Sequence, residues 1–296
     1  MRWMKVAVQA AAECEEAITQ ILLAVGAQGV MLEGAGPART VIAYLPEQAE
    51  LSAAQLERQV RDLGRYGLSA GDARVSIEWV QDEDWAESWK RHYKPLPIGR
   101  RLLVKPAWVE VPRTDRHVIE LDPGMAFGTG YHPTTALCLE ALEEVVAPGV
   151  TVVDVGTGSG ILAIAAALLG AGSVVAVDID PQAVEAARQN CRRNGVDDRV
   201  WVAAGSAGSA RALLAGRRAQ VVVANILADV IAEMAVDLHS LLVPGGTLVA
   251  SGIIDHASES VRTRLAAAGF TLLDERARGE WRCLLAARDN GCTASS

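Results

Sequence analysis

One glycine-rich run constrains the fold of this chain more than any other feature, VVDVGTGSG at residues 152–160. Gly156, Gly158 and Gly160 follow an apolar segment, and Asp178 ends the next apolar segment. Because glycine has no Cβ, the backbone can turn tightly there and approach a ligand closely. A strand, a tight turn, a helix and a second strand ending in an acid form a unit that binds a nucleoside cofactor. We therefore predict an α/β sheet with a nucleoside site at this turn.

The rest of residues 119–288 supports this fold class, because apolar segments alternate with helical ones. Helical periodicity is clearest at 159–169 and 181–194, and Pro244-Gly245-Gly246 reads as a turn. The pattern predicts strands at residues 151–155, 173–178, 199–203, 220–224, 246–251, 270–274 and 281–287. The prediction is a seven-stranded Rossmann-like α/β domain, followed by a disordered polar tail at 289–296.

Residues 1–80 have a different organisation, in the order strand, helix, strand, strand, helix, strand. The predicted strands are at 5–9, 29–32, 40–44 and 75–79, and the predicted helices at 13–25 and 52–63. This order is typical of a small ferredoxin-like α+β domain. Between the two domains, residues 81–118 hold Trp85 and Trp89, four positions apart, and two prolines in Lys94–Gly99. We interpret this stretch as an ordered connector.

Composition narrows the class of partner. The 296 residues carry a formal net charge of −8, which fits a small molecule or a basic protein better than direct reading of nucleic acid. The five cysteines form no C-x-x-C pair and the five histidines are dispersed, so no metal site is predicted. Cys138 and Cys191 fall in helical stretches, where buried, inert thiols are expected. No membrane span or secretion signal is evident, so a cytoplasmic protein is expected.

The glycine run differs from the G-x-G-x-x-G of dinucleotide-binding oxidoreductases. Asp154 stands two residues before Gly156, and the resulting D-x-G-x-G-x-G resembles the first motif of S-adenosylmethionine-dependent methyltransferases. In such sites the acid at Asp154 helps to set the turn and the cofactor amine, and Asp178 binds the ribose hydroxyls. Asp180, just before Pro181, is better interpreted as a helix N-cap. A glycine-rich turn without a ligand is the simpler alternative.

Asn225 ends the fourth apolar strand of this domain, where methyltransferases commonly hold an acceptor amine. An amine is nucleophilic only when neutral, so it needs hydrogen-bond acceptors that orient its lone pair. Enzymes that methylate base amines usually have prolines and an aromatic residue here, whereas this chain has Asn225-Ile226-Leu227-Ala228. A flipped base would lack its stacking platform. A helix N-cap is the other interpretation of Asn225.

A shaped loop at 121–135, LDPGMAFGTGYHPTT, leads into a helix that is expected to begin near Thr134. Its threonines are candidates to contact the amino-acid end of the cofactor, although a threonine before a helix is often only a cap. His132 is a candidate base, but a histidine beside a proline more often has a structural role.

These segments together resemble the bacterial ribosomal protein L-eleven methyltransferase family. The resemblance rests on the loop 121–135, on residues 154–161, 177–181 and 225–228, and on Trp85, Trp89 and Pro106-Ala107-Trp108. It covers most of residues 80–287. By resemblance, Thr135, Gly156, Asp178 and Asn225 match the family's cofactor-contacting positions, and Phe127 and Thr134 lie in its loop. Tyr131 and Thr157 replace a common threonine and a frequent cysteine.

The family implies a ferredoxin-like domain that recognises the substrate, joined to a methyltransferase domain. It also implies transfer of several methyl groups from S-adenosylmethionine to lysine side chains and the N-terminal amine of a large-subunit ribosomal protein. The cofactor site is predicted to include Asp154, Gly158 and Gly160 with the residues above, and Asn225 is the predicted catalytic residue. The alternatives are methylation of another protein, a base or a small molecule, a nicotinamide-dependent oxidoreductase, and a catalytically silent binding module.

Overall fold

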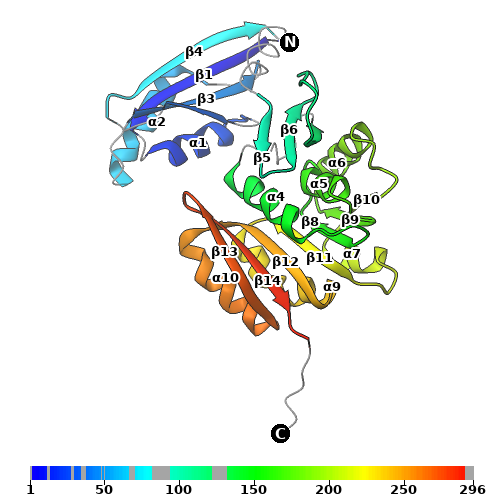
Figure 1. Ribbon diagram of the computed structural model, residues 1–296. Helices are drawn as coiled ribbons and strands as arrows, with labels where there is room; N and C mark the ends of the chain where they lie inside the picture. Colours follow the sequence, from blue (N-terminus) through cyan, green and yellow to red (C-terminus); the bar gives the residue numbers. More distant parts are fainter. Residues whose placement is uncertain are drawn as a thin grey trace. The chain divides into compact units, whose positions relative to one another are not determined.

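The chain folds into two compact units, residues 1–93 and 94–296 (Figure 1). The structure is a computed structural model. It describes residues 2–11, 14–27, 30–34, 38–47, 49, 51–66, 71–81, 94–121 and 132–290. Trp85, Trp89, Phe127, Tyr131 and residues 291–296 lie outside the described part. Asp289 lies inside it, and its carboxylate accepts a hydrogen bond from Thr271 Oγ1 at 2.6 Å.

The first unit contains the predicted order of strands and helices. These elements are β1 (Arg2–Ala11), α1 (Glu15–Ala24), β2 (Val30–Glu33), β3 (Ala38–Pro46), α2 (Ala53–Asp62), a 3-10 turn (Leu63–Tyr66) and β4 (Arg74–Gln81). Among the described residues the strands form one four-stranded sheet in the order β2-β3-β1-β4, with every neighbour antiparallel. Val6 and Val8 of β1 are buried and share a core with Ile18, Leu22 and Leu56. The alternation of buried and exposed positions along β1 is that of a sheet with one face covered by helices.

Residues 94–121, which include much of the predicted connector, belong to the second unit. In the described part they form a small sheet of β5 (Leu96–Ile98), β6 (Leu102–Pro106) and β7 (His117–Leu121). Its turn is fixed to the helix α4 (Pro133–Val145) by Glu143, whose carboxylate accepts the backbone N–H groups of Arg100 at 2.8 Å and Arg101 at 2.7 Å.

The main sheet of the second unit has, within the described residues, the seven strands that the sequence predicts. They are β8 (Thr151–Val155), β9 (Ser173–Asp178), β10 (Val200–Ala204), β11 (Ala219–Asn225), β12 (Leu242–Ile254), β13 (Phe270–Arg278) and β14 (Trp281–Arg288). Their order is β10-β9-β8-β11-β12-β14-β13, parallel up to β12 and antiparallel at β14 and β13. The predicted turn at Pro244-Gly245-Gly246 is wrong. These residues lie inside β12, where the register with β11 shifts.

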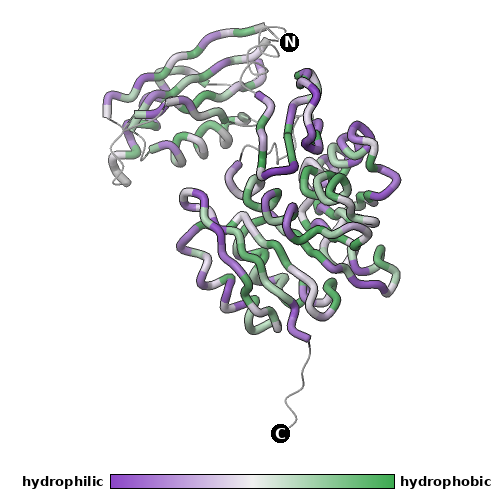
Figure 2. The backbone as a smooth tube through the Cα atoms, in the orientation of Figure 1, coloured by the Kyte–Doolittle hydropathy of each residue, from purple (hydrophilic) through white to green (hydrophobic). Residues whose placement is uncertain are grey.

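Helices cover both faces of this sheet, so its inner strands are apolar on both sides, whereas the edge strands β10 and β13 are more exposed. The helices are α4, α5 (Ile161–Leu168), α6 (Pro181–Arg193), α7 (Ala207–Leu213), α8 (Ala228–Glu233), α9 (Ala235–Leu241) and α10 (Asp255–Ala267). Val152 lies in the core with α4 and α5, whereas its neighbour Val153 lies in the core with α7, α9 and α10. Burial on both faces explains why the inner strands are largely apolar runs, as the colouring of Figure 2 shows.

Candidate functional site

The candidate site lies at the carboxyl ends of the central parallel strands. The strand order reverses between β8 and β11, because β9 and β10 continue on one side of β8 and β12 on the other. Open α/β sheets bind ligands in the crevice at such a switch point. Gly156, Asp178 and Asn225 stand at the ends of the three strands that meet there. Residues distant in sequence are thus brought to one edge.

The glycine turn is fixed to the neighbouring strand through its backbone. Gly156, Gly158 and Gly160 have φ angles of 76°, 55° and 84°, a region that strongly favours glycine. The N–H groups of Gly156 and Thr157 both donate to the carbonyl of Val177, at 2.9 and 3.0 Å. A Cβ on Gly156 would lie 2.3 Å from Ile226 Cγ2, so the turn leaves no room for a side chain.

Gly160 allows the start of α5 to approach α6 closely. A Cβ built on Gly160 would lie 3.1 Å from Ala187 Cβ and 3.2 Å from Ala187 Cα. The same contact is held by Asn190, whose buried amide donates to the carbonyl of Ser159 at 2.9 Å. The third glycine therefore positions the helix whose first turn borders the site.

We expect Gly160→Ala to destabilise the protein more than Gly195→Ala. Gly195 also has a positive φ, 62°, but no described atom lies within 4 Å of a Cβ placed there. The control should lose about 1–2 kcal/mol of unfolding free energy from backbone strain. Gly160→Ala should lose about 1–3 kcal/mol more from crowding against Ala187. Urea unfolding of both variants tests this, and equal losses would contradict the proposed close approach.

Asp154 is fully buried beneath the turn. Its Oδ2 accepts hydrogen bonds from Thr157 Oγ1 at 2.6 Å and from the N–H of Ala163 at 3.1 Å. Its Oδ1 has no hydrogen-bond partner within the described residues. Burial raises the pKa of Asp154 to about 7, against the opposing effect of these hydrogen bonds. An unpaired buried carboxyl oxygen at this point is a fit for a cationic ligand group such as an ammonium.

The sequence did not reveal the role of Thr157 in the candidate site, because the comparison with the family pattern marked it only as a replacement for a frequent cysteine. Its hydroxyl orients the Asp154 carboxyl from within the glycine turn. A hydroxyl three positions after a buried acid was the available signal.

The protonation of Asp154 should make stability depend on pH in the absence of ligand. An unfolded aspartate has a pKa of about 3.9. Between that pH and about 7 the folded protein keeps the Asp154 proton and the unfolded chain does not. The contribution of this proton to the free energy of unfolding is therefore complete below pH 4 and is lost as the pH rises through 7. As the pH rises from 4 to 8, the wild type should lose about 2–4 kcal/mol of unfolding free energy that Asp154→Asn, which does not titrate at this position, retains. Urea unfolding at several pH values measures this, and parallel pH profiles would contradict it.

Asp178 and Asp180 have separate structural roles. The Asp178 carboxylate accepts the N–H of Gly158 at Oδ2, 2.8 Å away, and the N–H of Asp180 at Oδ1, 3.0 Å away. Asp180 is the N-cap of α6, as predicted, and accepts the N–H of Gln182 at 2.8 Å. Each Asp178 oxygen keeps a second lone pair that could accept a ribose hydroxyl. The adjacent Ile179 side chain, 82% exposed, adds an apolar surface that the sequence interpretation did not include.

Asn225 contacts the first turn of α4. Its Nδ2 donates to Thr135 Oγ1 at 3.3 Å, across a separation of 90 residues. No hydrogen bond to Asn225 Oδ1 is made within the described residues, so this oxygen is an available acceptor. The alternative interpretation of Asn225 as a helix N-cap is wrong, since the N-cap of α8 is Leu227.

The threonines of α4 are buried and are not caps. Thr134 and Thr135 have 1% and 0% of their surface exposed, and the N-cap of the helix is His132. The Nδ1 of His132 lies 2.7 Å from Thr134 Oγ1 and 3.4 Å from the N–H of Thr134. Burial lowers the pKa of His132, and the nearby Glu280 raises it. His132 therefore has a structural role at the start of the helix.

The cysteines and possible metal-binding groups of the described residues add no further chemistry to this site. Cys138 and Cys191 are buried, free thiols, and burial raises the pKa of Cys191 to about 12. No group of three or more His, Cys, Asp or Glu side chains that could hold a metal ion occurs in the described ranges. Among the helices that the structure describes, none is long and apolar enough to cross a membrane.

The fold and the site together define a class of protein. The main sheet is mixed and has the strand order β10-β9-β8-β11-β12-β14-β13, and a glycine turn lies between Asp154 and Asp178. These features are those of an α/β S-adenosylmethionine-dependent methyltransferase. The family model described as "Ribosomal protein L11 methyltransferase (PrmA)" matches residues 2–289. The chain belongs to this family.

Individual relatives agree with this assignment. Proteins named ribosomal protein L11 methyltransferase from Pelotomaculum thermopropionicum and Exiguobacterium sibiricum are 43% and 40% identical to this chain. The alignments cover 97% and 98% of this chain and 99% and 100% of the relatives. The crystal structure of ribosomal protein L11 methylase from Lactobacillus delbrueckii subsp. bulgaricus is similar with a TM-score of 0.59 and 35% identity, over 67% of this chain and 100% of that chain.

Proposed function

We propose that this protein transfers methyl groups from S-adenosylmethionine to lysine side chains and the N-terminal amine of ribosomal protein L11. The observation that carries the proposal is the position of Asn225. Its amide nitrogen donates to Thr135 at the switch point of the sheet, and its Oδ1 can accept an amine N–H. The match of the chain to the methyltransferase family supports the same assignment. The absence of prolines and an aromatic ring in residues 225–228 supports a protein amine over a base.

The residues around the turn fit the proposed cofactor. Asp178 would accept the ribose hydroxyls, Ile179 would lie against the flat base, and Asp154 with Thr135 would lie near the amino-acid end. The buried Oδ1 of Asp154 and the positive φ angles of the three glycines support this arrangement. Thr134, Gly158 and Gly160 would line the cofactor site, and Phe127 is assigned to it by family resemblance alone.

The proposed reaction is an in-line displacement. When bound, S-adenosylmethionine supplies a methyl group activated by its sulfonium. A neutral amine attacks the methyl carbon, the carbon–nitrogen bond forms as the carbon–sulfur bond breaks, and the electron pair of that bond stays on sulfur. The amine proton leaves to solvent. Asn225 Oδ1 contributes by orienting the amine lone pair, which is catalysis by positioning without a covalent intermediate.

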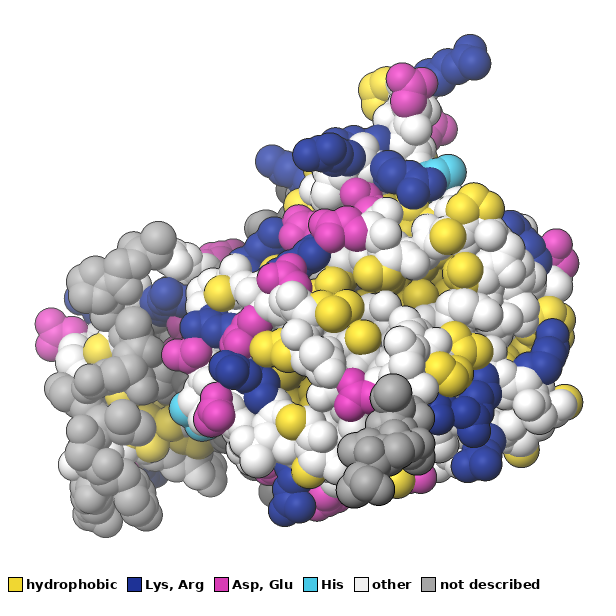
Figure 3. All heavy atoms as spheres, turned by 60° about the horizontal axis from the view of Figure 1, so that its bottom comes forward, with side chains coloured by type: hydrophobic (Ala, Val, Ile, Leu, Met, Phe, Trp, Pro, Cys, Tyr) yellow, Lys and Arg dark blue, Asp and Glu magenta, His cyan; other side chains and the backbone are white. Residues whose placement is uncertain are grey.

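The first unit is proposed to recognise the protein substrate. Its strand order β2-β3-β1-β4, with antiparallel neighbours and two crossover helices, supports the ferredoxin-like assignment of residues 1–80. Residues 81–118 are the proposed connector, whose described part from residue 94 belongs to the second unit, and residues 119–288 are the proposed Rossmann-like catalytic domain. The net charge of −8, with basic side chains interspersed among acidic ones on the face drawn in Figure 3, supports a protein partner over nucleic acid.

The test is transfer of radiolabelled methyl groups from S-adenosylmethionine to ribosomes and ribosomal proteins from a source that lacks this methylation. Label in the L11 band is expected. Label in RNA alone would overturn the proposal of a protein substrate. Calorimetric titration with S-adenosylhomocysteine and, separately, with NAD tests the cofactor, and binding of NAD alone would favour the oxidoreductase alternative.

A further inference from the structure

Trp281 is an aromatic side chain at the edge of the candidate site that the proposed function does not use. It begins β14, which is antiparallel to β12, so it lies opposite Ile254 at the carboxyl end of that strand. Its half-buried ring packs on His132, with ring centroids 4.8 Å apart and planes inclined by 69°. The ring is therefore at the sheet edge that holds the glycine turn.

Two independent paths connect Trp281 to Asn225. The first is α4, because His132 contacts Trp281 and Thr135, in the same helical turn, contacts Asn225. The second is the sheet, because Asn225 lies opposite Ser251, whose hydroxyl donates to the carbonyl of Arg282 at 2.9 Å. The indole and the Asn225 amide thus border the same first turn of α4.

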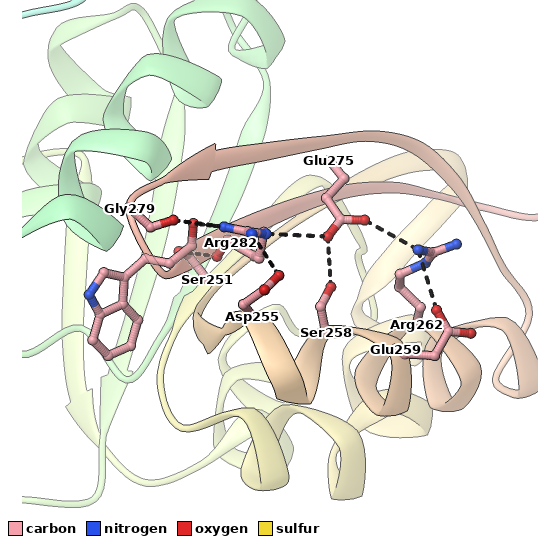
Figure 4. A network of polar contacts seen from close by, with 9 residues as sticks. Ser251, Asp255, Ser258, Glu259, Arg262, Glu275, Gly279 and Arg282 are labelled. Carbon is pink, nitrogen blue, oxygen red and sulfur yellow. Dashed lines mark hydrogen bonds and ion pairs between the residues drawn. The ribbon is translucent and has the colours of Figure 1, made fainter.

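A polar network fixes the backbone beside Trp281. Arg282 donates to the carbonyl of Gly279 at 3.0 Å and pairs with Asp255 at 2.6 Å. Figure 4 shows the Arg282 side chain between the carboxylates of Asp255 and Glu275. The hydroxyl of Ser258, a residue of α10, donates a hydrogen bond to the same Glu275 carboxylate. The N–H of Asp255 donates to the carbonyl of Glu280 at 2.8 Å. The turn that carries Glu280 and Trp281 is therefore held in place before any substrate arrives.

We propose that Trp281 and Glu280 form the subsite that holds the acceptor nitrogen in its ammonium form before each transfer, ahead of the proton loss that makes it nucleophilic. This inference rests on the proposed function. A cation is attracted to the face of an indole ring and to a carboxylate, and the exposed Glu280 lies close enough to influence His132 electrostatically. Each added methyl group removes an N–H that Asn225 could accept, whereas attraction to the ring does not depend on N–H groups. Trp281 should therefore matter most for the second and third methyl groups.

The experiment compares wild type, Trp281→Leu and Trp281→Phe on unmethylated L11, with intact-mass spectrometry at timed intervals. In Trp281→Leu the first methylation should remain within about threefold of wild type, and the later steps should slow about tenfold. Trp281→Phe should restore the later steps. Trp201→Leu, which removes a half-exposed tryptophan from β10, is the matched control and should behave as wild type.

A second variant covers the case in which Trp281→Leu fails to fold. Glu280→Gln changes only an exposed side chain and should raise the KM for L11 about threefold without changing the affinity for S-adenosylhomocysteine. Equal slowing of every methylation step in Trp281→Leu, or an unchanged KM in Glu280→Gln, would overturn the inference. A wild-type enzyme that stops at monomethyl-lysine would also overturn it, yet leave the proposed function intact. Absence of any transfer by wild type would instead refute the proposed function.

Discussion

Replacing Asp178 with alanine is expected to weaken binding of S-adenosylhomocysteine at least about 100-fold, because two hydrogen bonds to a charged group are lost. The same carboxylate also holds the N–H groups of Gly158 and Asp180, so its removal loosens the glycine turn as well. Isothermal titration calorimetry of both proteins at one pH and ionic strength measures the change. A loss below about threefold would contradict the assignment of Asp178 to the ribose.

Asp180→Ala is the matched control for that measurement. Asp180 lies two residues further along and caps α6 through the N–H of Gln182, at 2.8 Å. Its removal should lower the free energy of unfolding by about 1 kcal/mol. The affinity for S-adenosylhomocysteine should change little. If Asp180→Ala weakened binding as much as Asp178→Ala, the division of roles between the two acids would be wrong.

Asn225→Ala is expected to lower kcat about 100-fold, because a misplaced nucleophile loses most of the benefit of positioning. The affinity for S-adenosylhomocysteine should stay within about threefold, since the amide side chain is assigned chiefly to the acceptor amine. Single-turnover methylation of L11 and calorimetry on the same preparation separate the two effects. Equal losses in both would count against an acceptor role for Asn225.

Thr135 provides the partner experiment. Its hydroxyl accepts from Asn225 Nδ2 at 3.3 Å and so determines which side of the amide faces the amine. Thr135→Ser keeps that oxygen and should retain most of the turnover, whereas Thr135→Val removes it and lets the amide rotate. Similar turnover in the serine and valine variants would show that the orientation of the amide does not limit the reaction.

Much of the fold was predictable, because the relevant signals are local. The five inner strands of the main sheet, β8, β9, β11, β12 and β14, were predictable because burial on both faces makes them largely apolar runs. The edge strands β10 and β13 are more exposed. The interruption at Pro244-Gly245-Gly246 was misread as a turn, since a register shift inside a strand has the same composition as a turn. The inclusion of 94–121 in the second unit was not predicted either, because it depends on distant partners such as Glu143.

Some features of the candidate site were likewise predictable from the sequence and others were not. The positions of Asp154 and Asp178 at the ends of successive strands, and the capping role of Asp180, were predictable because they follow from local sequence patterns. By contrast, the contact of Asn225 with Thr135 and that of His132 with Trp281 join side chains from opposite ends of the domain. The sequence alone does not show which of these distant side chains come into contact.

By itself, the sequence determined where the glycine turn lies, which acids flank it and which family the chain resembles. These features depend on backbone conformation and spacing over a few residues, and glycine φ angles and apolar runs encode them directly. The tertiary structure decided that Asn225 is hydrogen-bonded to Thr135, that Thr157 is hydrogen-bonded to the buried Asp154, and that Trp281 packs on His132. The contacts of Asn225 with Thr135 and of Trp281 with His132 arise only when the sheet order brings β11 and β14 against α4, since strand order is a product of long-range packing.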